Sequence, residues 1–313
     1  KSAEHAMTLS GAIPTYLVPT RNRFGIIGPI LPQTLSAEGV KAAIANNPLV
    51  KSHIDPTPVH AIVTNSTYDG LTYNVTRVEE LLGESVDRLH FDEAWYGYAR
   101  FNPLYRDRFA MHGSPDDHDP SKPTVFATQS THKLLAALSQ ASMIHVRNGR
   151  NPIPHGRFNE SYMMHASTSP NYAIMASCDV SSAMMEAPSG EILTGESIEE
   201  AIAFRQVISR MNSEMRKGDD WFFSCWQPPV VSVDGAQVPF HEVDANTLKT
   251  EPECWVLHPN EVWHGFGDIE EGYCMLDPIK VSVLSPGMGD DGNLLDFGIP
   301  ACVLTAYLGR QGI

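Results

Sequence analysis

Positive charge is scarce in this chain. Among its 313 residues, 22 are Lys or Arg and 37 are Asp or Glu, so the formal net charge is −15. A surface of that sign repels nucleic-acid phosphates and anionic membranes. We therefore expect neither nucleic acid nor a membrane as a partner, and the acidic balance weakly favours a cationic substrate.

Long apolar runs and closely spaced cysteines are also missing. No apolar run reaches the roughly 20 residues of a membrane-spanning helix, and no signal-peptide pattern opens the chain. The five cysteines are odd in number and widely spaced, without a C-x-x-C pair. This usage favours reduced thiols in a cytoplasmic protein over a disulfide framework.

The hydrophobic content of 42% is enough for one large domain or two modest ones. Strand-like and helix-like patterns alternate up to about residue 147, which predicts an α/β fold in three layers, with a mostly parallel, mixed sheet between helices. The predicted helices are Ser2–Ser10, Ser36–Asn46 with Ser36 as N-cap, Thr76–Leu82 with a Thr76/Glu79 capping box, Phe158–Ser169, Asp179–Glu186 and Ser197–Arg216. The predicted strands are Thr15–Val18, His60–Asn65, Arg88–Phe91, Thr124–Gln129, Met143–Val146, Trp221–Trp226 and Val281–Gly287.

The helix predicted over Ser197–Arg216 is clearly amphipathic. Its apolar positions include Ile198 and Ile202, and Arg205 and Arg210 are assigned to the polar face. A composition shift near residue 218 is interpreted as a subdomain boundary, and the stretch from Pro228 to Pro252 is expected to be rich in loops.

Three polar stretches follow predicted strands: Thr64–Gly70, Asp92–Trp95 and Ser130–Lys133. Ligands of parallel α/β sheets collect at the carboxyl ends of the strands. The sequence therefore predicts a binding site where these three stretches meet.

Lys133 is the main candidate for chemistry at that edge. It follows the strand Thr124–Gln129 and precedes an apolar run of helix formers, so it is expected at the start of a helix. A lysine there opposes the helix dipole, and a desolvated amine is a nucleophile that forms Schiff bases. The neighbouring hydroxyl and N–H groups suit a phosphate, so this combination indicates pyridoxal 5′-phosphate.

Two other interpretations of this segment, the elbow Ser130–Lys133, stay open. An exposed lysine at a helix start is often only solvated. Ser130–Lys133 also matches the S-x-x-K nucleophile motif of serine β-lactamases, but their S-D-N and K-T-G triplets do not occur in the sequence.

Asp92 also has two interpretations. It is either the N-cap of a following helix or the carboxylate that keeps the nitrogen of a pyridine ring protonated. Trp95, three residues on, is either a core residue or part of the pocket.

The histidine- and aspartate-rich segment from His112 to Asp119 is interpreted as a polar loop, because nothing in its spacing fixes a ligand geometry. We expect no metal site.

Five ordered blocks resemble a known family. They are DEAW at 92–95, STHKLLAALSQASMIHV at 130–146, YMMHASTSP at 162–170, WHGF at 263–266 and LDPIKVSVLSPGM at 276–288. They look like the bacterial inducible arginine, lysine and ornithine decarboxylases, which are pyridoxal-phosphate enzymes of the aminotransferase-like fold type I. FATQSTHKLLAALSQAS, PGMGDDG and LGRQGI look most like the biodegradative arginine decarboxylases.

The resemblance implies a role for each site residue. Lys133 matches the lysine that carries the cofactor, Asp92 the acid at the pyridine nitrogen, and Trp95 a pocket residue beside it. Ser130 and His132 match residues near the cofactor phosphate, and His132 is counted with the catalytic residues. Ser167 falls where a hydroxyl from a neighbouring subunit reaches the phosphate, which implies a homodimer or a larger oligomer built from dimers.

The resemblance also implies a reaction and a domain order. The expected activity is decarboxylation of a basic L-amino acid, with arginine to agmatine plus CO2 favoured. Lysine or ornithine as substrate, another reaction of the same cofactor, and a non-catalytic oligomerising member are the alternatives. Because each turnover consumes a proton, acid resistance is an expected role.

The chain looks like a segment of a longer enzyme, since the family's phosphate loop and ring-stacking histidine would precede it. Residues 1–217 are expected to form the incomplete large domain, and residues 218–313 its continuation and the start of the C-terminal subdomain.

Overall fold

The computed structural model describes residues 2–51, 57–217 and 222–313. The α-helices are α1 (Ser2–Ser10), α2 (Pro32–Leu35), α3 (Ala37–Ala45), α4 (Val75–Gly83), α5 (Thr131–Leu134), α6 (His155–His165), α7 (Tyr172–Met184), α8 (Ser189–Lys217), α9 (Ala245–Thr250) and α10 (Ala301–Arg310). The strands are β1 (Ala61–Thr64), β2 (Leu71–Tyr73), β3 (Arg88–Asp92), β4 (Thr124–Gln129), β5 (Met143–Arg147), β6 (Ser224–Cys225), β7 (Val230–Val233), β8 (Ala236–Pro239), β9 (Cys274–Leu276) and β10 (Val283–Leu284). Short 3-10 helices are η1 (Gly97–Phe101), η2 (Pro103–Tyr105), η3 (Pro115–Asp117), η4 (Phe240–Glu242) and η5 (Pro252–Trp255). Within these ranges, no helix combines the length and apolarity needed to cross a bilayer.

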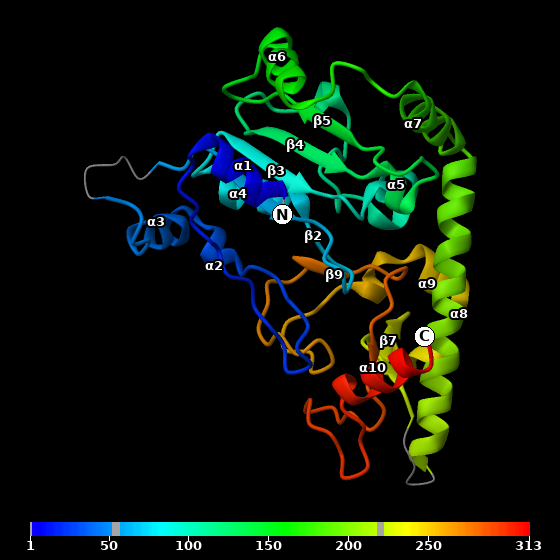
Figure 1. The fold of residues 1–313 in the computed structure, drawn as a ribbon. Coiled ribbons are helices and arrows are strands. Elements are labelled where there is room, and N and C mark those ends of the chain that lie inside the picture. The colour runs from blue at the N-terminus through cyan, green and yellow to red at the C-terminus, as the bar shows by residue number, and fades with distance from the viewer. Residues whose placement is uncertain (1, 52–56, 218–221) are drawn as a thin grey trace.

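The central sheet has the order β1-β3-β4-β5. β1, β3 and β4 run parallel, and β5 runs antiparallel to β4. The segment between β4 and β5 holds only the single turn α5, which is too short for the crossover helix that a parallel neighbour needs. Figure 1 shows the sheet in the upper half of the molecule, with α6 above it and α4 on the opposite side. The predicted α/β fold with a mostly parallel, mixed sheet is confirmed.

Helix caps set the ends of the helices next to the sheet. Ser36 caps α3 as predicted, and its hydroxyl accepts a hydrogen bond from the Gly39 N–H. The capping box predicted for α4 is wrong, because Asn74 is the N-cap and its side chain accepts from the Arg77 N–H. Thr76 lies inside the helix. The side-chain oxygen of Asn74, directly before the helix, accepts from a backbone N–H of the first turn and so takes the capping role predicted for Thr76.

Other predicted elements changed in length. The strand predicted over Thr15–Val18 does not form, and the strands predicted over Trp221–Trp226 and Val281–Gly287 shrink to β6 and β10, which pair antiparallel. Trp221 lies outside the described residues, as does the boundary predicted near residue 218. The stretch from Pro228 to Pro252 is more ordered than expected, because Asp234 and Gly235 adopt positive φ values and close the β7–β8 hairpin.

Helix α8 contains the predicted helix Ser197–Arg216 and runs along the edge of both halves of the molecule (Figure 1). Ile198 and Ile202 are buried as predicted, but Arg205, which was assigned to the polar face, is buried as well. The Arg205 side chain is fully buried because its guanidinium donates to the backbone carbonyls of Pro278 and Lys280.

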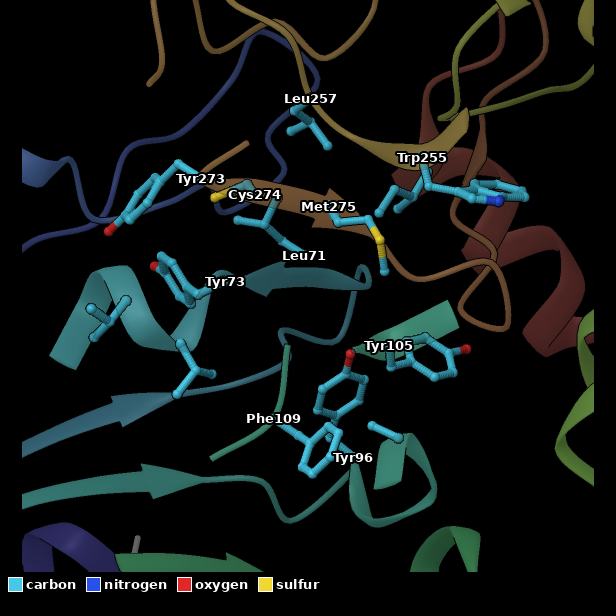
Figure 2. Close-up of a cluster of buried hydrophobic side chains, with 14 of the residues drawn as sticks. Leu71, Tyr73, Tyr96, Tyr105, Phe109, Trp255, Leu257, Tyr273, Cys274 and Met275 are labelled. Carbon is cyan, nitrogen blue, oxygen red and sulfur yellow. The ribbon is translucent and has the colours of Figure 1, made fainter. Parts of the chain in front are cut away.

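The main core joins the two halves of the chain. β2 pairs with β9, which follows it by about 200 residues, and the Tyr73 and Tyr273 rings meet edge to face at 5.4 Å. Figure 2 shows this pair above Tyr96, Tyr105 and Phe109, which belong to the segment after β3. The residues after Asp92 are therefore packed against the C-terminal part of the chain.

Candidate active site at the carboxyl edge of the sheet

The three polar stretches meet at one edge of the sheet, as the sequence predicts. In the β-ladders, Thr64 pairs with Asp92 and Asp92 pairs with Thr128. The chain leaves each of these parallel strands at the same level. Ser130–Lys133 therefore follows β4 beside the residues that follow Asp92.

Asp92 is half-buried at the end of β3. Its carboxylate accepts a hydrogen bond of 3.2 Å from the Ala94 N–H, and the next helical residues begin only at Gly97. Asp92 therefore makes a local turn rather than capping a helix directly.

Lys133 and Trp95 are brought together at this edge. The Lys133 Nζ lies 4.9 Å from the centroid of the Trp95 ring, which is a cation–π contact. The exposed ring of Tyr68 also meets the Trp95 indole edge to face, at 5.8 Å between centroids. The Trp95 Nε1 is buried without a hydrogen-bond partner in the described structure.

The helix predicted to follow β4 is much shorter than expected. α5 is one turn long, and Leu135 is already extended. A single turn sums few peptide dipoles, so the argument for an anion site at a helix N-terminus does not apply here. The donors that the elbow offers are side chains, and the Thr131 Oγ1 is buried without a partner among the described atoms.

His132 is held in one tautomer. Its backbone N–H and its ring Nδ1 both donate to the Ala141 carbonyl, at 3.2 Å and 2.7 Å. Because a carbonyl only accepts, Nδ1 carries a proton, and in the neutral ring Nε2 is an acceptor. The same contacts turn the chain back toward β5 after α5.

Ser167 does not join these residues. It is exposed in the segment after α6, and its hydroxyl exchanges hydrogen bonds with the backbone of Ser169. Its predicted role belongs to a site formed by two subunits and stays a prediction.

Two charged residues near this edge received no role from the sequence. The Glu93 carboxylate is fully buried beside Asp92, and burial raises its pKa to about 7. The Lys280 ammonium contacts the Ser66 hydroxyl and donates to the Thr67 carbonyl at 3.2 Å. Both lie within blocks that carry the family resemblance, DEAW and LDPIK, but only their packing reveals their contacts.

Lys280 supports the turn that carries Tyr68. Burial lowers the pKa of its ammonium, while the nearby Asp277 carboxylate opposes that shift. The Asp277 carboxylate in turn accepts from the hydroxyls of Tyr98 and Tyr105. This buried network ties the C-terminal half of the chain to the turn after β1.

The mixed sheet and the solved structures that superpose on this chain define the class, an α/β protein of the pyridoxal-phosphate fold type I. The family model described as Orn/Lys/Arg decarboxylase, major domain, matches residues 1–313. The chain belongs to this family.

Decarboxylases named for arginine, for lysine and for ornithine all match the whole chain. It is 54% identical to the biodegradative arginine decarboxylase of Escherichia coli K12, 47% to the lysine decarboxylase LdcA of Pseudomonas aeruginosa, and 34% to the constitutive ornithine decarboxylase of Escherichia coli K12. These alignments cover 100% of this chain but 42%, 39% and 43% of the respective relatives. The chain thus spans about two fifths of the length of the relatives it matches.

Solved structures give the same result. Lysine decarboxylase A from Pseudomonas aeruginosa superposes with a TM-score of 0.87 at 46% identity, over all of this chain and 40% of that one. The constitutive lysine decarboxylase of E. coli superposes with a TM-score of 0.80 at 38% identity, over all of this chain and 39% of that one.

Proposed function

We propose that the intact protein decarboxylates a basic L-amino acid with pyridoxal 5′-phosphate, and that arginine, which yields agmatine and CO2, is its substrate. The observation that carries this proposal is the placement of Lys133 over Trp95, beside the strand that ends in Asp92. The higher identity to an arginine decarboxylase than to the lysine and ornithine decarboxylases favours arginine.

The residues at the strand edge fit this cofactor. Lys133 supplies the amine that holds it, and Asp92 supplies the carboxylate for its ring nitrogen. Ser130 and His132 would hold the cofactor phosphate, and the unpaired Thr131 Oγ1 and Trp95 Nε1 could donate to acceptor oxygens. When bound, pyridoxal phosphate supplies the electron sink that makes loss of CO2 feasible.

Each residue has a separate task in the proposed reaction. Asp92 keeps a proton on the ring nitrogen by ion pairing. Trp95 covers one side of Lys133 and excludes water there. The Lys133 amine would hold the cofactor and would return a proton to the substrate Cα after loss of CO2.

We further propose a homodimer, or a larger oligomer built from dimers, in which Ser167 of one subunit completes the phosphate site of the other. Its exposure after α6 supports this arrangement. Residues 1–217 would form the incomplete large domain, and residues 218–313 its continuation and the start of a C-terminal subdomain. Five free cysteines support the expected cytoplasmic location.

Product analysis of the intact protein with arginine, lysine and ornithine tests the proposed substrate. We expect agmatine and CO2 from arginine at a kcat/KM above that for the other two. Cadaverine or putrescine as the dominant product would reassign the substrate, and no amine product from any of the three would reject the decarboxylase.

The role of Asp92 has its own test. Asp92→Asn removes the charge that holds the ring proton but keeps the shape of the side chain. We expect the variant to retain the cofactor and to lose orders of magnitude in kcat, and near-normal turnover would contradict the role.

A further inference from the structure

Glu93 lies between the ends of three strands. Its carboxylate Oε1 accepts hydrogen bonds from the Ala110 N–H at 2.7 Å and from the Asn65 side chain at 3.2 Å. Its Oε2 accepts from the Gln129 side chain at 3.2 Å. Asn65 follows β1, Glu93 follows β3 and Gln129 ends β4, so one carboxylate joins all three parallel strands.

The Asn65 side chain, just after β1, is itself held in place. The Asn65 N–H donates to the Asp92 carbonyl at 2.9 Å, and its side chain also donates to the Arg108 carbonyl at 2.8 Å. The Asn65 Oδ1 accepts from the Tyr73 N–H at 3.1 Å. Asn65 therefore gives the Glu93 carboxylate a rigid support at the end of β1.

Glu93 also extends the link between β3 and β4 beyond the regular ladder. The last ladder pair is Asp92 with Thr128. One residue further on, the Glu93 N–H donates to the Thr128 carbonyl at 3.0 Å, and its carboxylate holds the Gln129 side chain. The next residue after Gln129 is Ser130, where the elbow that carries Lys133 begins.

Burying the Glu93 carboxylate costs desolvation free energy. Glu93 is 0% exposed, and its recorded hydrogen-bond partners among the described residues are neutral N–H groups rather than a cation. A neutral or apolar side chain of similar size would avoid the desolvation cost. The carboxylate instead fixes the orientation of the groups around it, because it accepts hydrogen bonds from three segments at once.

We propose that Glu93 is a positioning residue that holds Gln129, and through it the elbow of Lys133, in place relative to Asp92. This inference rests on the proposed function, because the geometry it fixes is that of the cofactor lysine and the acid at the ring nitrogen. Small displacements at a reacting centre cost on the order of 10²-fold in rate, so the link between Glu93 and Gln129 matters more for catalysis than for folding.

Three variants of the intact enzyme test this link. Glu93→Gln turns an amide toward the Gln129 amide, Gln129→Met removes the donor and leaves the buried carboxylate its other two partners, and the double variant Glu93→Gln/Gln129→Glu exchanges the two groups. In the double variant, the new amide donates to the new carboxylate. Gln237→Met, on the exposed side of the β7–β8 hairpin, controls for the loss of an amide elsewhere.

The measurements are kcat, KM, the dissociation constant of pyridoxal phosphate from its visible absorbance, and the thermal unfolding midpoint. We expect each single variant to lose at least about tenfold in kcat and to bind cofactor more weakly, equivalent to roughly 1.4 kcal/mol or more, at nearly unchanged KM. The double variant should recover most of the kcat and cofactor affinity lost by Glu93→Gln. The Gln237→Met control should match the wild type in all four quantities.

Two results would overturn the proposal. One is a Gln129→Met variant whose kcat and cofactor affinity lie within about twofold of wild type. The other is a folded double variant no better than Glu93→Gln, and Gln129→Met decides alone if Glu93→Gln does not fold. A wild-type protein that neither binds pyridoxal phosphate nor releases CO2 would instead reject the proposed function, so the two failures are distinguishable.

Discussion

The buried Arg205 on α8 gives a sharp prediction for stability. Its guanidinium donates to the carbonyls of Pro278 at 3.1 Å, Lys280 at 2.7 Å and Trp226 at 3.4 Å, and to the Gln227 side chain at 3.2 Å. Burial lowers its pKa to about 10, so it stays protonated at neutral pH. Replacing it by Met keeps most of the packing and leaves these acceptors unpaired.

The cost follows from the unpaired acceptors. A buried group without its partner costs about 1–3 kcal/mol, and the two shortest bonds, to Pro278 and Lys280, account for most of the effect. Relief from burying a charge offsets part of it, so we expect Arg205→Met to lower the free energy of unfolding by about 3 kcal/mol. Denaturant titration of the intact protein measures this loss.

The matched control is Arg210→Met on the same helix, where the side chain is exposed. Exposed substitutions of this kind change stability by less than about 0.5 kcal/mol. A loss in Arg205→Met no larger than in Arg210→Met would show that the Arg205 hydrogen bonds to the buried carbonyls do not stabilise the fold.

Three smaller predictions concern residues around the sheet. Asn74→Ala should cost about 1 kcal/mol of stability by denaturant titration, and Thr76→Ala clearly less, because Asn74 is the cap of α4; equal losses would contradict this. Arg147→Met should cost about 3–5 kcal/mol, since it leaves the buried Glu79 carboxylate, 2.8 Å away, unpaired; a loss below about 1 kcal/mol in the same titration would refute it. The pKa of Glu93, raised from 4.5 to about 7 by burial, should make the wild type lose stability relative to Glu93→Gln as pH rises from 4.5 through 7. The stability contributed by its proton is complete below pH 4.5, and up to about 3 kcal/mol is lost by pH 8; unfolding curves that stay parallel across that range would speak against it. The neighbouring Asp92 charge raises the pKa of this carboxyl further, and Tyr96 also interacts with it.

The sequence was most informative about the parallel sheet. Arg88–Phe91 and Thr124–Gln129 are short strand-like segments followed by polar residues. Both signals are local, so the strand ends and the edge of the candidate site were predictable. The antiparallel direction of β5 was not, because it depends on how the chain returns after Lys133.

Tertiary contacts explain where prediction from sequence failed. The Leu- and Ala-rich run after Lys133 has high helix propensity, but the hydrogen bonds from His132 to the Ala141 carbonyl turn the chain back after one turn. Arg205 looks like a surface residue because of its charge, although it lies seven residues after Ile198 on the buried face of α8. Only the carbonyls about 70 residues later make its burial favourable. The contacts of Glu93 could not be predicted either, because its three hydrogen-bond donors come from separate segments that meet only in the folded chain.

The visible absorbance of the intact protein with pyridoxal phosphate, compared between wild type and Lys133→Ala, tests the central claim most directly. We predict that the wild type shows the absorbance band of lysine-bound cofactor and that Lys133→Ala loses it together with amine production. Lys41→Ala, an exposed lysine on α3, should keep both. An unchanged spectrum in Lys133→Ala would contradict the assignment of Lys133 as the cofactor lysine.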